Sequence, residues 1–367
     1  MTATLLAGIP ATNMALYHRC RFVAGDPAAW VKLPGETVFI CRNIEVDRAR
    51  KSTNADRVIA PADVVDDPSG ERDVMTAQAV VALLRDANVG NVVGDRSLGL
   101  VYVDVLREAG IEVRLDRDLG VADRRSKDAD ELTHLRHCQS ITERAMRTAC
   151  EHIARADADT GGHLHHDGTP VTSDSVRALI ELLLIDHGMA SEHGTIVAGL
   201  PHCADCHDRG EGPLRTGEPV IIDIFPRDRR SLYWGDCTRT VVHGTPTPEL
   251  AAMHAAVVES KAAAIATIQA GVTGAEVHAA AQGVIHAHGF DDMVHGTGHG
   301  VGLDVHEAPL LDAKGGPLVA GDVLTIEPGL YHEQHGGVRV EDMVVVTDTG
   351  HDNFNTLPES LAWKNAL

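Results

Sequence analysis

Two aspartates in the second half of the chain stand where apolar, strand-like runs end or begin. Asp223 closes the run that starts at Pro219, and Asp236 follows Gly235 at the start of the next run. A carboxylate at the end of an apolar run is costly to bury unless a cation or a hydrogen-bond donor receives it. If the two runs form a hairpin, the side chains of Asp223 and Asp236 can face each other.

Three histidines lie in a glycine-rich segment further along, His295-Gly-Thr-Gly-His-Gly-Val-Gly-Leu-Asp-Val-His306. Because glycine allows the backbone to pack closely, we expect the imidazoles of His295, His299 and His306 to converge. A further carboxylate lies beyond this segment. Pro328 stops a predicted strand and leaves Glu327 at its end.

In the segment Val338–Val346, polar and apolar residues alternate in a way typical of a strand. Successive residues of a strand point to opposite faces, so Arg339 and Glu341 are expected to share one face.

One imidazole and four carboxylates carry too much negative charge to converge without metal ions, since repulsion and desolvation would protonate the acids or unfold the site. Two divalent ions bridged by carboxylates remove this problem. Oxygen-rich ligation with a single imidazole suits manganese, iron(II), cobalt or zinc, and we expect manganese first. The predicted ligands are Asp223, Asp236, His299, Glu327 and Glu341.

The order Asp, Asp, His, Glu, Glu resembles that of the pita-bread metallopeptidases, which include methionine aminopeptidases, aminopeptidase P, prolidase and creatinase. The resemblance runs from about residue 129 to residue 361. It implies that Asp223 chelates one metal, that Asp236 and Glu341 bridge the two, and that His299 and Glu327 hold the other.

The turn from Glu327 to Tyr331 and the arginine two residues before Glu341 resemble the aminopeptidase P and prolidase branch. The resemblance implies an exopeptidase that hydrolyses the N-terminal bond of Xaa-Pro peptides or dipeptides through a metal-bridging hydroxide. It further implies that Glu327 transfers the proton, that His306 donates to the carbonyl oxygen, and that His295 lines the pocket with Arg339 as a further site residue.

The same family has one more histidine upstream, near a proline. In the segment Val197-Ala-Gly-Leu-Pro-His-Cys-Ala-Asp-Cys-His207, alignment from Val197 favours His207, and His202 is the alternative. The run from Cys203 to His207 also matches a haem-attachment motif, and a separate zinc site is a further alternative. An active-site loop that carries two thiols is the preferred interpretation.

Two other functions stay open at this point. One is a creatinase-like hydrolysis of a non-peptide C–N bond, without metals. The other is a peptidase-like pseudoenzyme that binds a partner. The intact ligand set argues against both.

The elements that position these residues divide into two parts. Residues 1–122 alternate strand and helix patterns, with strands at 37–41, 58–60, 91–94 and 111–115 and helices at 74–88 and 100–109. This favours a small α/β domain with a largely parallel sheet, and it resembles the creatinase-like N-terminal domain of the same branch. It serves as a scaffold or oligomerisation domain, or caps the active site of a neighbour.

Residues 123–367 are predicted to form the catalytic domain, of the α+β class and with the pita-bread fold. Helical patterns cover residues 129–156, 173–187, 248–269 and 275–288. Strand-like runs cover 219–225, 234–242, 323–327 and 338–346.

Charge and composition limit the partners. With 32 basic and 53 acidic side chains, the formal net charge is −21, which argues against nucleic acid or an anionic membrane. No apolar run is long enough for a membrane span, and the start does not resemble a signal peptide. Seven cysteines without a framework favour a reducing compartment, so we expect a cytoplasmic homodimer that binds a peptide substrate.

Overall fold

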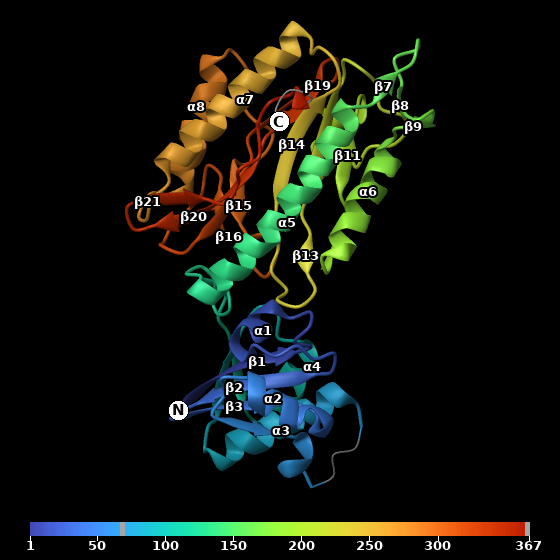
Figure 1. The fold of residues 1–367 in the computed structure, drawn as a ribbon. Coiled ribbons are helices and arrows are strands. Elements are labelled where there is room, and N and C mark those ends of the chain that lie inside the picture. The colour runs from blue at the N-terminus through green and yellow to red at the C-terminus, as the bar shows by residue number, and fades with distance from the viewer. Residues whose placement is uncertain (67–69, 364–367) are drawn as a thin grey trace. The chain divides into compact units, whose positions relative to one another are not determined.

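The computed structural model describes residues 1–66 and 70–363. The chain divides into two compact units, Met1–Arg124 and Arg125–Leu367, which are blue to teal and green to red in Figure 1. Their helices and mixed sheets agree with the predicted combination of a smaller α/β unit and a larger α+β unit.

The first unit is built on a six-stranded sheet with the order β4-β3-β2-β1-β5-β6. The strands are β1 (Thr2–Gly8), β2 (Ala28–Leu33), β3 (Glu36–Ile40), β4 (Arg57–Ile59), β5 (Asn91–Gly94) and β6 (Glu112–Leu115). The expectation of a largely parallel sheet is wrong for its centre, because β2 pairs antiparallel with both β1 and β3. Only two residues, Pro34 and Gly35, join β2 to β3, and so short a connection can only join antiparallel strands.

Helices cover this sheet. They are α1 (Met14–Cys20), α2 (Val46–Ser52), α3 (Arg72–Asp86) and α4 (Leu100–Glu108), with short 3-10 turns η1 (Asn43–Glu45), η2 (Pro61–Asp63) and η3 (Ala122–Arg124). Leu5 and Leu6 are adjacent in β1 yet belong to different buried clusters. The sheet is therefore packed on both faces.

Four helices frame the second unit: α5 (Ala129–Ala154), α6 (Ser173–Asp186), α7 (Pro248–Thr267) and α8 (Gly274–Ala287). The start of α5 is fixed by a capping box, in which Asp128 and Glu131 each accept a hydrogen bond from the other's backbone N–H. Thr172 is the N-cap residue of α6. Helices α7 and α8 lie side by side (Figure 1) and share an apolar core with the C-terminal strands.

The strands of the second unit form two main sheets. One has the order β11-β12-β14, with β11 (Ile196–Ala198), β12 (Pro219–Ile224) and β14 (Cys237–Val242) all antiparallel. The other has the order β16-β15-β17-β20-β21, formed by β15 (Gly298–Gly300), β16 (Glu307–Leu311), β17 (Val323–Ile326), β20 (Asp342–Thr347) and β21 (Gly350–Asn353). Smaller elements are β7 (Asp157–Ala158), β8 (Leu164–His166), β9 (Thr169–Pro170), β10 (Met189–Ala190), β13 (Arg227–Asp228), β18 (Gly329–His332), β19 (Gly336–Arg339) and the 3-10 turn η4 (His202–Ala204).

The expectation of one strand over residues 338–346 is wrong. The chain leaves strand geometry at Val340 and Glu341, between β19 and β20. The backbone N–H of Glu341 donates to the carbonyl of Thr238 in β14, so this segment passes from the β18–β19 hairpin to the five-stranded sheet. Arg339 and Glu341 therefore do not belong to one continuous strand, but their side chains lie on the same side, as expected, because both contact the hydroxyl of Thr238.

Among the described residues, no helix combines the length and the apolar content that a membrane span requires.

Candidate active site

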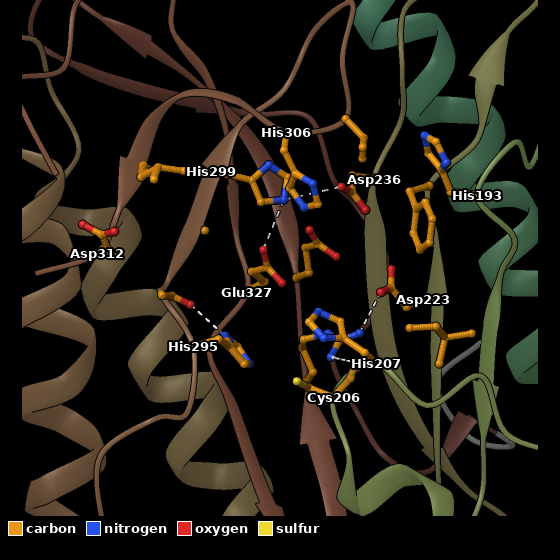
Figure 2. Close-up of a pocket in the computed structure, with 18 residues that line it drawn as sticks. His193, Cys206, His207, Asp223, Asp236, His295, His299, His306, Asp312 and Glu327 are labelled. Atoms are coloured by element: carbon orange, nitrogen blue, oxygen red, sulfur yellow. Dashed lines mark hydrogen bonds and ion pairs between the residues drawn. The ribbon is translucent and has the colours of Figure 1, made fainter. Parts of the chain in front are cut away.

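A pocket of about 650 Å³ lies in the second unit, and Figure 2 shows the side chains that surround it. Every residue assigned to the site from the sequence lines this pocket: His207, Asp223, Asp236, His295, His299, His306, Glu327, Arg339 and Glu341. These residues come from the three-stranded sheet, the five-stranded sheet, the β18–β19 hairpin and the loops beside them.

The two aspartates come from one antiparallel pair of strands. In the pairing of β12 with β14, Asp223 lies opposite Thr238. Asp236 precedes Thr238 by two residues and therefore occupies the diagonal position on the same face. The predicted hairpin arrangement is confirmed, although the short strand β13 is inserted in the connection.

His299 is held in β15 with one ring nitrogen directed towards the other candidate ligands. Its Nδ1 lies 3.0 Å from the carbonyl oxygen of Gly300. Its Nε2 lies 3.3 Å from Oε1 of Glu327 and 3.9 Å from Oδ2 of Asp236, as the dashed lines in Figure 2 mark. A carbonyl partner on one nitrogen fixes the tautomer that leaves the other nitrogen as a ligand.

The glycines around His299 allow two backbones to meet. A Cβ atom added to Gly298 would lie 1.9 Å from the carbonyl oxygen of Thr325, and the φ angle of Gly298 is +156°. Only glycine fits there, and the close approach brings β15 against β17, which ends just before Glu327.

Glu341 lies close to both Asp236 and His299. Its Oε2 accepts a hydrogen bond of 2.7 Å from the hydroxyl of Thr238. One ligand atom from each of Asp236, His299 and Glu341 lies within 4.8 Å of the other two, and all three residues are buried. It is the one group of this kind in the described ranges 1–66 and 70–363 that could hold a metal ion, so the alternative of a separate zinc site at Cys203–His207 is not supported there.

Without bound cations, the close packing of these buried carboxylates is electrostatically unfavourable. Burial raises the pKa of Asp223, Asp236 and Glu341, and neighbouring carboxylates raise it further. Burial would also raise the pKa of Glu327, but the hydrogen bond and the charge of His299 outweigh it and hold that pKa at about 2. Cations placed between these carboxylates would relieve both the burial and the repulsion.

The residues fit divalent metal ions. Oδ1 of Asp223 is buried and has no hydrogen-bond partner among the described residues, while Oδ2 of the same carboxylate accepts a 2.6 Å bond from Arg339. A buried, unpartnered carboxylate oxygen requires a cation or a donor. With a single imidazole, the donor set is of the kind that manganese, iron(II), cobalt and zinc accept.

Arg339 organises one side of the pocket. Besides Asp223, its guanidinium donates to the hydroxyl of Tyr331 at 2.9 Å and to the carbonyl of Cys206 at 3.0 Å. The Tyr331 hydroxyl also lies 2.9 Å from Nε2 of His295. Tyr331 thus connects Arg339 to His295. In the sequence Tyr331 marks only the end of a turn, and nothing in its spacing indicates these contacts.

The two candidate histidines of the upstream loop have different surroundings. His207 lines the pocket beside Cys206 (Figure 2). His202 is not among the lining residues, and its Nδ1 lies 3.0 Å from Oδ2 of Asp208.

His306 stands over the metal-binding group. Its ring centroid lies 4.2 Å from that of His299, with the planes at 73°. Burial lowers the pKa of His306, and the nearby His299 lowers it further. The imidazole therefore reaches the same space as the five candidate ligands.

Two residues of the site have no signal in the sequence. Gln139, in the middle of α5, is fully buried and bonds the backbone of Asp236 in both directions, at 2.9 and 2.7 Å. His193 lines the pocket from an exposed turn. Neither has a motif around it; only the packing of distant segments brings them to the site.

Known proteins resemble this chain over most of its length. The sequence model of metallopeptidase family M24 matches residues 133–348. The probable dipeptidase PepE of Mycobacterium tuberculosis is 30% identical over 334 residues, covering 89% of this chain and 82% of that protein. Xaa-Pro aminopeptidase 2 of Streptomyces coelicolor is 33% identical over 329 residues, covering 79% of this chain and 66% of the relative.

A solved structure has the same fold. The Xaa-Pro dipeptidase from Bacillus anthracis superimposes with a TM-score of 0.83 at 24% sequence identity, covering 98% of this chain and 94% of that one. At 24% identity, this similarity shows that the fold is shared and nothing more.

Proposed function

Because the chain belongs to metallopeptidase family M24, we propose that it is a dinuclear exopeptidase that hydrolyses the N-terminal bond of Xaa-Pro peptides. The predicted fold class, a pita-bread domain preceded by a smaller α/β domain, and the assignment as a metallopeptidase are confirmed. The observation that carries the proposal is that the four proposed ligand carboxylates and the imidazole of His299 line a single pocket.

In this proposal, Asp223 would hold one ion, His299 and Glu327 would hold the second, and Asp236 and Glu341 would serve both. Manganese is the first candidate, with cobalt, zinc or iron as alternatives. When bound, such ions polarise the scissile carbonyl and bring the pKa of water to about 7. The diagonal placement of Asp223 and Asp236 on one sheet face and the short contacts around His299 support this assignment.

Glu327 is the group that moves the proton. It accepts a proton from the attacking water and returns it to the departing nitrogen, as a general base and then a general acid. Its carboxylate is partly exposed to the pocket, unlike the buried Asp236 and Glu341, so it can reach water.

The imidazole of His306 binds the substrate carbonyl. His306 donates a hydrogen bond to the carbonyl oxygen as it gains negative charge. His207 and His295 line the same cavity, and Arg339 fixes the carboxylate of Asp223 and the hydroxyl of Tyr331. Arg339 is in this way a positioning residue.

Both Xaa-Pro dipeptides and longer Xaa-Pro peptides are candidate substrates, since the relatives carry the names of a dipeptidase and of an Xaa-Pro aminopeptidase. Proline has a tertiary amide that cannot donate a hydrogen bond, and its ring needs a shaped apolar wall. No observation favours the creatinase-like or pseudoenzyme alternatives. A homodimer and a cytoplasmic location stay predictions from the sequence.

The test uses manganese-loaded enzyme with Xaa-Pro dipeptides, Xaa-Pro-Yaa tripeptides and matched peptides with alanine in place of proline. We expect the proline peptides to be cleaved after the first residue, and the ratio of tripeptide to dipeptide turnover to separate an aminopeptidase from a dipeptidase. Equal or faster cleavage of the alanine peptides would refute the proline specificity and leave the metallopeptidase assignment intact.

A further inference from the structure

A second pocket lies in the first unit, which carries none of the residues assigned to catalysis. This first-unit pocket has a volume of about 600 Å³, and it lies beside α4, which Figure 1 labels. Gly94, the last residue of β5, and Leu115, the last residue of β6, both line it. These two strands run parallel to each other and to β1. The pocket is therefore at the carboxyl ends of parallel strands, where open α/β sheets bind ligands.

The lining of the first-unit pocket carries an excess of positive charge. Four arginines line it: Arg96, Arg107, Arg114 and Arg117. Within residues 1–66 and 70–363, none of these four guanidinium groups forms an ion pair. Arg96 instead donates through Nε to the carbonyl oxygen of Arg117, at 2.8 Å. Asp95 also lines the pocket, but it is buried and accepts a 2.6 Å bond from the hydroxyl of Ser97.

Arginines elsewhere in the same unit behave differently. Six of them pair with a carboxylate: Arg19, Arg42, Arg48, Arg50, Arg57 and Arg72. Acids are not scarce either, since the chain has 53 acidic and only 32 basic side chains. Guanidinium groups bind carboxylates and phosphates through two parallel N–H groups. Four of them together, without an acid partner in the described part of the chain, indicate a place for an anion that comes from outside.

Apolar side chains stand beside these arginines. Leu100, Val103 and Arg107 follow one another at helical spacing and share one face of α4. Val113 and Leu115 alternate along β6 and share one face of that strand. All five line the pocket. Leu100 and Leu115 are 84% and 60% exposed, so their apolar surface is open to a ligand.

The floor of the first-unit pocket is formed before any ligand binds. A Cβ atom added to Gly94 would lie 2.6 Å from Cδ2 of Leu98, so the Leu98 side chain packs directly on the backbone of β5. The backbone N–H of Asp116 donates a 2.9 Å bond to the carbonyl oxygen of Gly94. This bond continues the pairing of β5 with β6 beyond the last strand residues. The chain ends that carry the arginines are thus held together by the protein itself.

We propose that the first-unit pocket binds a small organic anion in which a carboxylate or phosphate group is attached to an apolar body. The charged group lies among the guanidinium groups, and the body lies against Leu100, Val103 and Leu115. The volume of the pocket is within the range of small-molecule sites, about 300–1,000 Å³. This binding site does not depend on the proposed exopeptidase function, because none of the candidate metal ligands belongs to the first unit.

The test is isothermal titration calorimetry of the full-length, manganese-loaded protein with four probes: phenyl phosphate, 3-phenylpropionate, inorganic phosphate and the neutral alcohol 3-phenyl-1-propanol. Phenyl phosphate or 3-phenylpropionate is expected to bind more tightly than inorganic phosphate and than the alcohol, and the tighter of the two identifies the charged group. Repeating the titration after removal of metal by a chelator separates this pocket from the metal site. Binding among arginines persists without metal, whereas binding to the metal ions is lost.

Substitutions locate the bound anion. Arg107→Gln and Arg114→Gln should each weaken binding of the preferred anion by about 10-fold, the effect of losing one charge-assisted hydrogen bond. Leu100→Ala should weaken binding of the two phenyl compounds by about 3-fold and leave inorganic phosphate unaffected. Arg57→Gln is the matched control, since Arg57 lies in the edge strand β4 of the same sheet and pairs with Glu36. Circular dichroism and the midpoint of unfolding verify that each variant is folded.

Four results would overturn the proposal. The first is that neither phenyl compound binds the wild type more tightly than the alcohol does. The second is that anion binding disappears with the metal. The third is that Arg107→Gln and Arg114→Gln bind as Arg57→Gln does. The fourth is that these two variants change the oligomeric state in sedimentation while the wild type binds no probe, which would assign the arginines to a contact between copies of the chain.

Discussion

Gln139 clamps the backbone of Asp236: its Oε1 accepts from the Asp236 N–H at 2.9 Å, and its Nε2 donates to the Asp236 carbonyl oxygen at 2.7 Å. The amide is completely buried. Helix α5 comes close because residue 235 is glycine; a Cβ atom there would lie 2.3 Å from the hydroxyl of Thr142. The helix therefore positions a proposed bridging ligand without contacting the pocket.

We predict that Gln139→Glu weakens metal binding roughly 10- to 100-fold, the usual effect of losing a group that orients a ligand. A carboxylate at this position cannot donate to the Asp236 carbonyl. Calorimetric titration with the metal measures the change in binding affinity. Ser140→Ala, an exposed neighbour on the same helix, is the control, and equal affinities in the two variants would show that the clamp does not matter.

The ligand segments could be predicted from the sequence, whereas Gln139 could not. Asp223 and Glu327 each follow an apolar run, and His299 lies among glycines that can only serve close packing, so local sequence identifies them. Gln139 is one polar residue within a long helix, and its role depends on how closely Gly235 approaches that helix.

The errors in the fold have a similar origin. At the break, the N–H of Glu341 bonds to Thr238, which is 103 residues away in the sequence. Alternation within the segment indicates a continuous strand, and it carries no information about that distant partner. The antiparallel centre of the first sheet is built on residues 2–8 and 28–33, which lie outside the runs from which a parallel sheet is predicted.

For His306 we predict a loss in kcat of roughly 10²- to 10³-fold on substitution by alanine, as expected for one donor to a developing oxyanion. The metal content of His306→Ala should equal that of the wild type, because His306 stands beside His299 without being one of the proposed ligands. Steady-state kinetics and elemental analysis test this together. His286→Ala, at an exposed position, is the control, and loss of metal from His306→Ala would assign it a different role.

His207→Ala is predicted to impair turnover more than His202→Ala. His207 lines the pocket, whereas His202 is bonded to Asp208 outside it. Comparison of kcat/KM for the two variants on one Xaa-Pro peptide decides the matter. A larger loss in His202→Ala would mean that the histidine of this loop has been misassigned.

Breaking the buried ion network behind the site should destabilise the protein. Asp342 bonds both Arg239, at 2.8 Å, and the ammonium of Lys261, and all three are buried. Although burial raises the pKa of Asp342, the two cations outweigh it and hold the pKa at about 2. Lys261→Met should cost about 3–5 kcal/mol in the free energy of unfolding, because it leaves part of a buried charge uncompensated.

Chemical denaturation of the metal-free protein measures this cost, with Lys314→Met at an exposed position as the control. A loss no larger in Lys261→Met than in Lys314→Met would show that water or rearranged partners satisfy Asp342.

The central claim is that Asp223, Asp236, His299, Glu327 and Glu341 hold two catalytic divalent ions. The most direct measurement removes metal with a chelator, restores it by titration with manganese, and follows bound ions per chain together with hydrolysis of an Xaa-Pro peptide. We expect the stripped enzyme to be inactive, activity to return as two ions bind, and Glu341→Ala to lose both binding and turnover. Full activity in metal-free enzyme, or undiminished metal binding and turnover in Glu341→Ala, would contradict the claim.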